Sequence, residues 1–108
     1  MATLLHNITS TTTKELLALG DNVSAIKSIV VVNVDSSNAS YVDIYLFDKS
    51  NNASYYLTKG TKIHKGATLV LKANDGVVFN NSINGYSLRI QVDNGSTTAV
   101  PVDVIISQ

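Results

Sequence analysis

The sequence predicts an all-β protein, a two-sheet antiparallel β-sandwich of about eight strands with a jelly-roll or immunoglobulin-like topology. Val, Ile and Thr account for 32 of the 108 residues, and β-branched side chains favour strands over helices. Glu occurs once, at Glu15, although surface helices usually carry several. Short apolar runs alternate with clusters of Asn, Ser, Gly and Asp, as is typical of sandwiches.

The first third of the chain predicts an arm or edge strand, a short segment and a long central strand. Residues 1–13 are polar and rich in Thr, so we expect an N-terminal arm or edge strand there, followed by a single sandwich domain over residues 14–108. Residues 14–19 end at Gly20 as a helix might end, but their alternating pattern favours a strand. Residues 25–35 predict a long central strand. The side chains expected in the core from this strand are Ile26, Val30, Val32 and Val34.

The second half reads as a series of shorter strands separated by turns. We expect strands over residues 41–47, 54–58, 67–72, 77–79, 87–93 and 100–107. Asn74-Asp75-Gly76 and Asn84-Gly85 predict turns, and Pro101 indicates an edge position or a strand start. The side chains expected in the core are Val42, Ile44, Leu46, Leu88, Ile90, Val92, Val100, Val102, Val104 and Ile106.

Two of these strands, residues 25–35 and 41–47, are apolar on both faces. A sandwich strand with one face in water normally alternates apolar and polar side chains. The outward side chains therefore predict an exposed apolar and aromatic patch, which monomers rarely leave uncovered. Three explanations are open: the N-terminal arm folds over this patch, the strands have a different register so that these side chains are not exposed, or the patch is a subunit interface. The candidate interface residues are Ile29, Val31, Tyr41, Tyr45 and Phe47.

Composition argues against several classes of partner. Eight basic and eight acidic residues give a net charge of zero, whereas nucleic-acid binding needs clustered Lys and Arg. There is no cysteine, so neither a disulfide nor a thiolate metal site is expected. We find no apolar run long enough to cross a membrane and no signal peptide, so no membrane partner is expected.

The residues also give no reason to predict an enzyme, a cofactor or a metal site. His6 and His64 lie far apart, and no G-x-S-x-G nucleophile elbow is present. Residues 48–52 begin like a calcium loop, but Ala53 and Lys59 stand where such a loop needs Gly and Glu. Five tyrosines and two phenylalanines offer rings that could stack on a sugar, so a glycan-binding module is a minor alternative.

Three segments resemble small β-sandwich virion proteins of tailed bacteriophages, including cyanophage-like viruses. They are KSIVVVNVDSSNASYVDIYLFD, SYYLTKGTKIHKGATLVL and the closing VDVIIS. The shared features are an apolar strand ending at Asn33 and an I-x-x-G-x-T-L-x-L segment that begins at Ile63. The resemblance covers about residues 10–107. It departs from the group at His64, where Pro is common, and at the turn over residues 19–22.

The resemblance implies a non-enzymatic structural protein located in the virion. It implies a capsid decoration or cement subunit that stabilises the particle through many weak contacts. The implied partners are the major capsid protein or other virion subunits, together with further copies of the chain in a homo-oligomer. A tail, neck or fibre-associated position is the alternative that the same resemblance leaves open.

Overall fold

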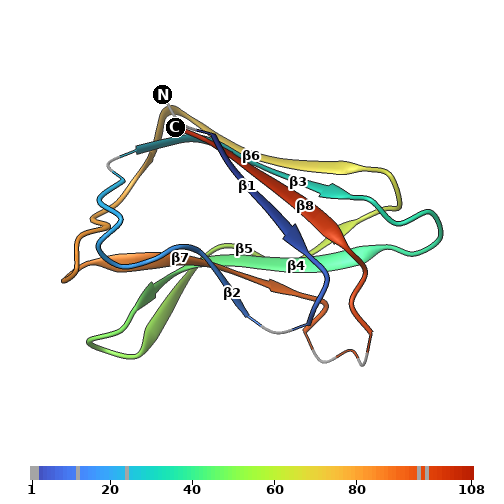
Figure 1. The fold of residues 1–108 in the computed structure, drawn as a ribbon, viewed down its shortest axis with the longest axis horizontal. Helices are drawn as coiled ribbons and strands as arrows, with labels where there is room; N and C mark the ends of the chain where they lie inside the picture. Colours follow the sequence, from blue (N-terminus) through green and yellow to red (C-terminus); the bar gives the residue numbers. More distant parts are fainter. Residues whose placement is uncertain (1–2, 12, 24, 95, 97) are drawn as a thin grey trace.

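The structure, a computed structural model, is a sandwich of two antiparallel four-stranded sheets, which confirms the predicted fold class (Figure 1). It describes residues 3–11, 13–23, 25–94, 96 and 98–108, and only the backbone of residues 73–78. The strands of this part of the chain are β1 (Thr3–Ile8), β2 (Lys14–Leu17), β3 (Ala25–Asn33), β4 (Ser40–Asp48), β5 (Ala53–Ile63), β6 (Thr68–Val78), β7 (Tyr86–Val92) and β8 (Val102–Ser107).

The strand order is that of a jelly roll. Sheet A has the order β1-β8-β3-β6, and sheet B has the order β2-β7-β4-β5. Each strand of the first half pairs with its mirror image in the second half: β1 with β8, β2 with β7, β3 with β6 and β4 with β5. The chain is therefore one long antiparallel hairpin wrapped into two sheets, and this pairing excludes the immunoglobulin-like alternative.

The N-terminal segment, predicted as an arm or an edge strand, is the edge strand β1. It pairs with β8 over six residues, from Thr3 opposite Ser107 to Ile8 opposite Val102. Residues 1, 2 and 12 of the predicted arm lie outside the described residues. The following segment is strand β2 rather than a helix, because Leu16 and Leu17 can then cover the core from the edge of sheet B.

The edge strands β5 and β6 are longer than the sequence predicts. β5 continues to Ile63, past a left-handed Gly60 whose amide donates to the Asp43 carboxylate. β6 joins two predicted strands, and the predicted turn at residues 74–76 falls where its pairing with β3 jumps from Lys72 to Val77. The turn residues therefore interrupt the ladder with an irregularity instead of ending the strand.

The core lies between the sheets and is built from the alternate side chains of the four central strands. The predicted inward faces of β4, β7 and β8 are confirmed, with Val100, which precedes β8, only half-buried. Leu46 on β4 is also half-buried and packs against the core cluster. The side chains of these three strands that are fully buried are Val42, Ile44, Leu88, Ile90, Val92, Val102, Val104 and Ile106.

The predicted core face of β3 is wrong beyond its first residue. Ile26 is buried as expected, but Ile29 and Val31, predicted to face outward, are 0% exposed. Val30 and Val32 are half-buried, and Val34 is 47% exposed. The register irregularity between Ile26 and Ser28 shifts the alternation by one residue, so every later side chain changes face.

Two buried asparagines fix the loops at the two ends of the sandwich. Asn33, at the end of β3, donates from Nδ2 to the carbonyls of Asn38 and Ile63, and its Oδ1 accepts from the Asp35 amide. At the other end, Asn81 joins the β2–β3 loop to the β6–β7 loop through Ala18 and Val23. Backbone groups that leave the sheets at these points are thus satisfied by side chains.

Replacing Asn33 by Ala is expected to destabilise the fold by about 2–3 kcal/mol, because it leaves the buried Ile63 carbonyl unpaired and frees the β3–β4 turn. Chemical denaturation followed by far-UV circular dichroism measures the change in the free energy of unfolding, since the chain has no tryptophan whose fluorescence could be used. Asn84→Ala, at an exposed turn position, is the matched control and should change the free energy of unfolding by less than about 0.5 kcal/mol. Equal effects of the two substitutions would contradict the role of Asn33.

Candidate functional site

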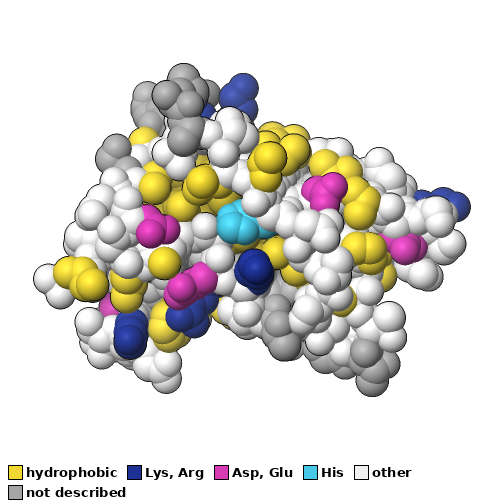
Figure 2. All heavy atoms as spheres, viewed as in Figure 1, with side chains coloured by type: hydrophobic (Ala, Val, Ile, Leu, Met, Phe, Trp, Pro, Cys, Tyr) yellow, Lys and Arg dark blue, Asp and Glu magenta, His cyan; other side chains and the backbone are white. Residues whose placement is uncertain are grey.

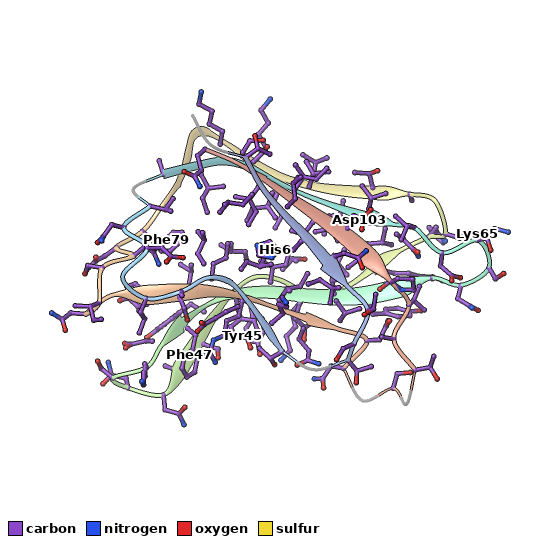
Figure 3. The ribbon with its side chains drawn as sticks, viewed as in Figure 1. His6, Tyr45, Phe47, Lys65, Phe79 and Asp103 are labelled. Carbon is purple, nitrogen blue, oxygen red and sulfur yellow. The ribbon has the colours of Figure 1, made fainter. Side chains whose placement is uncertain are left out.

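The five predicted interface residues do not form one surface. Ile29 and Val31 are in the core and cannot contact a partner in this fold. Tyr45 and Phe47 lie on the outer face of sheet B, on the side away from sheet A (Figure 3). Tyr41 belongs to the same strand but stands at the loop end of the sandwich, where it is 47% exposed.

The two predicted interface residues on the outer face of sheet B, Tyr45 and Phe47, are packed against their own neighbours. Tyr45 is 8% exposed, because the Tyr56 ring packs against it with centroids 5.2 Å apart. The Arg89 guanidinium lies 4.0 Å from the centre of the Phe47 ring and pairs with Glu15 at 3.2 Å. These contacts cover much of Tyr45 and a face of the Phe47 ring, whereas the Tyr56 side chain itself is 46% exposed.

The outer face of sheet A, in contrast, carries an apolar row that crosses all four strands. Leu5 on β1 stands opposite Ile105 on β8, Ile105 opposite Val30 on β3, and Val30 opposite Val70 on β6. Leu5 is 71% exposed and Val70 is 53% exposed at the two ends of the row, and Ile105 and Val30 between them are half-buried. Such a continuous apolar row on an outer face is characteristic of a contact surface.

Mostly polar side chains flank this row on both sides. The flanking row on one side is Thr3, Ser107, Ser28 and Lys72, and the one on the other side is Asn7, Asp103, Val32 and Thr68, in which only Val32 is apolar. The Asn7 amide donates to the Asp103 carboxylate at 2.6 Å. An apolar centre with a polar rim is the usual arrangement of a protein interface.

The sequence indicated an exposed apolar face on segment 25–35, but the predicted register assigned the wrong side chains to it. Segment 25–35 is apolar on both faces, as predicted, and the exposed face is the one with Val30 and Val32. The matching residues Leu5, Ile105 and Val70 come from three other strands. They align only once the strand order and the register of each pair are known.

His6 is the histidine in the most unusual environment. Its ring points between the two sheets at the open side of the sandwich, and one histidine is visible in the middle of this side (Figures 2 and 3). Its Nε2 is buried without a hydrogen-bond partner in the described part of the chain. Burial lowers the pKa of His6 below its ordinary 6.5. The Lys14 ammonium lowers it further, and a hydrogen bond with the Leu16 backbone acts in the opposite direction.

Among the described residues, no group of three or more His, Cys, Asp or Glu side chains is placed to hold a metal ion. His64 lies in the exposed β5–β6 turn, at the loop end, and His6 lies on β1. The calcium-like run at residues 48–52 is a turn in which the Asp48 carboxylate accepts from the amides of Ser50 and Asn51. Its carboxylate thus stabilises the backbone of the hairpin.

A hollow lies at the loop end of the sandwich, beside Tyr41. Its volume is about 460 Å³, and its walls come from the β3–β4 and β7–β8 loops. Asp93 lies beneath it, 6% exposed, with a left-handed backbone at φ 50°. The other residues that line the hollow are Asn38, Ala39, Asn94, Ser96, Thr98 and Val100.

Comparison with known proteins assigns the chain to no family: no family model matches it, and no curated protein is similar to it. In the part of the chain that the structure describes, no helix has the length and apolarity of a membrane span. Fold and surface define the protein as a jelly-roll domain with an apolar row on the outer face of sheet A and a separate loop-end hollow.

Protonation of His6 is expected to destabilise the fold. Because the folded state lowers the pKa of His6, the stabilisation from the neutral ring is complete above pH 6.5 and is lost as the pH falls through the lower folded value. Thermal melts between pH 7.5 and 4.5 should therefore show a steeper fall in melting temperature for the wild type than for His6→Gln. Asp35, whose pKa is lowered by the amides of Ser37 and Asn38, loses its contribution only near pH 3.8 and below. Parallel pH profiles for the two proteins would show that His6 is not responsible.

Proposed function

We propose that the protein is a non-enzymatic structural subunit of a virus particle, a capsid decoration or cement protein that binds its neighbours through the outer face of sheet A. The observation that carries this proposal is the apolar row from Leu5 to Val70. The sequence resemblance to small virion proteins of tailed bacteriophages supports it. The jelly roll is also a fold of viral capsid domains, although a fold alone does not define a function.

The physical case for a subunit rests on the cost of leaving this face in water. Exposed apolar surface costs about 25 cal/mol per Å², and the row joins exposed side chains into one patch instead of scattering them. The row crosses the whole sheet, from edge strand β1 to edge strand β6. An extended apolar row of this kind suits contact with another folded surface, and a hollow of about 370 Å³ at its Leu5 end could receive a side chain of the partner.

The composition fits the same role. A neutral chain with eight basic and eight acidic residues suits packing among copies, because it adds no large repulsion between them. A subunit that contacts several neighbours at once gains apparent affinity without a single strong site. Assembly around a symmetry axis provides such contacts, so the proposed partners are the major capsid protein and further copies of this chain.

The self-association part of the proposal is tested by light scattering at micromolar to millimolar concentration. The wild type should form a species heavier than the 11.5 kDa chain. Leu5→Ser combined with Val70→Ser should weaken association about a hundred-fold, because it removes two exposed apolar side chains from the row. Ile83→Ser is the matched control, since Ile83 is 73% exposed and Leu5 is 71% exposed but Ile83 lies in the β6–β7 loop. Loss of association in the control alone would contradict the proposed face.

The particle part is tested by sedimenting the purified protein with empty capsids and, separately, with isolated tails of the phage that encodes it. A decoration subunit should sediment with capsids, and the Leu5→Ser, Val70→Ser variant should not. Sedimentation with tails alone would assign the protein to the tail, neck or fibre alternative. Absence from both fractions, together with a monomeric wild type, would overturn the proposed function.

A further inference from the structure

The hollow at the loop end has the features of a built binding site rather than a gap between loops. It measures about 460 Å³, which lies within the range of small-ligand sites in proteins. The Tyr41 ring stands at its edge and is 47% exposed, although buried neighbours surround it on β4. The β3–β4 and β7–β8 loops, which line the hollow, lie at one end of the sandwich (Figure 1), so a ligand there leaves the outer face of sheet A free.

The buried Asp93 carboxylate holds the two walls together. Its Oδ1 accepts from the Tyr41 amide at 2.8 Å, and its Oδ2 accepts from the Val100 amide at 2.7 Å. The Asp93 amide in turn donates to the Tyr41 carbonyl. One side chain thus ties strand β4 to both ends of the β7–β8 connection, and the backbone that carries the Tyr41 ring is held in place before any ligand arrives.

The opposite wall is held in the same way. Asp35 Oδ2 accepts from the amides of Ser37 and Asn38, and the Asn33 amide nitrogen donates to the Asn38 carbonyl. The β3–β4 loop is therefore fixed by side chains at both of its ends. A preformed groove loses less entropy on binding than a groove that must first order its loops.

The chemistry of the lining selects an uncharged, hydroxyl-rich ligand. Asp93 is the one charged side chain among the described lining residues, and its carboxylate repels anions while both of its oxygens are occupied by protein donors. Asn94 and Thr98 present an amide and a hydroxyl that make no side-chain hydrogen bond to a described residue. Amides and hydroxyls exchange hydrogen bonds with sugar hydroxyls, and an aromatic ring packs against the apolar C–H face of a sugar.

We propose that this groove binds a neutral saccharide, with the Tyr41 ring as the stacking platform and Asn94 and Thr98 as hydrogen-bonding partners. A groove of about 460 Å³ accommodates one or two sugar rings. Because it is open at the surface, the affinity of a single site is weak, in the millimolar to micromolar range, and many copies on one particle would raise it. This proposal stands apart from the proposed assembly through sheet A and can hold if that assembly fails.

The test is a two-dimensional ¹⁵N–¹H NMR titration of the folded protein with glucose, galactose, N-acetylglucosamine and their β-linked disaccharides, supported by a glycan array. At least one neutral saccharide should shift the amides of Tyr41, Asn94 and Val100. Tyr41→Ala should weaken its binding about ten-fold or more, whereas Tyr41→Phe, which keeps the ring, should stay within about three-fold of the wild type. Tyr55→Ala is the matched control, because Tyr55 is 54% exposed on β5, away from the groove, and its loss should leave binding unchanged.

Each outcome decides the proposal. Loss of binding in Tyr41→Ala but not in Tyr55→Ala, with melting temperatures of both close to the wild type, supports it. Binding that survives Tyr41→Ala, or that shifts amides elsewhere in the molecule, overturns the location. A preference for acidic sugars overturns the neutral ligand and would point to Lys62, which stands opposite Tyr41 on β5. No shift with any neutral saccharide at tens of millimolar overturns the proposal as a whole.

Discussion

The register of β3 is the constraint on which the rest of the molecule depends. β3 lies in the interior of sheet A between β8 and β6, and a slip by one residue would turn its whole buried set outward. The irregularity between Ile26 and Ser28 makes this choice: it keeps Ile26 in the core and brings Ile29 and Val31 in behind it. The same choice places Val30 on the outside, in line with apolar residues of the three other strands of the sheet. Core and contact surface are therefore two consequences of one local feature.

The two outer faces of the sandwich differ in how they treat their apolar side chains. On sheet B, Arg89 lies over the Phe47 ring and Lys59 over the Tyr56 ring, and Tyr56 packs against Tyr45. On sheet A, Leu5 and Val70 stand exposed at the two ends of the apolar row. Aromatic side chains are usually enriched at interfaces, but in this chain Tyr45 and Phe47 lie on sheet B and not in this row. The row on sheet A also lies apart from the groove at Tyr41, so the two proposed functions do not compete for one surface.

Much of the fold was predictable from local patterns, whereas the functional surfaces depended on long-range register. The fold class followed from the β-branched composition, and the inward faces of β4, β7 and β8 followed from simple alternation. Three other features depend on pairing between distant residues, such as Ser28 with Lys72 and Ser107. They are the jelly-roll order, the joining of two predicted strands in β6, and the exchange of the buried and exposed faces of β3. The loop-end groove required Asp93 to reach residues on both sides of it, and nothing in its immediate sequence indicates this. Of the five residues predicted for an interface, Tyr41 kept a place at a candidate site, but in a groove rather than on a flat face.

The most direct test of this account is the reactivity of a single thiol on each face of β3. The chain has no cysteine, so Val30→Cys and Val31→Cys each introduce one unique thiol. Each variant would be labelled under native conditions in dilute solution with a maleimide reagent, and its rate compared with the rate in denaturant. The account predicts that the thiol at position 30 reacts readily, and that the thiol at position 31 reacts about a hundred-fold more slowly, because Val31 is 0% exposed. A thiol at position 31 that reacts as fast as the one at position 30, or faster, would contradict the register of β3 and with it the proposed contact face.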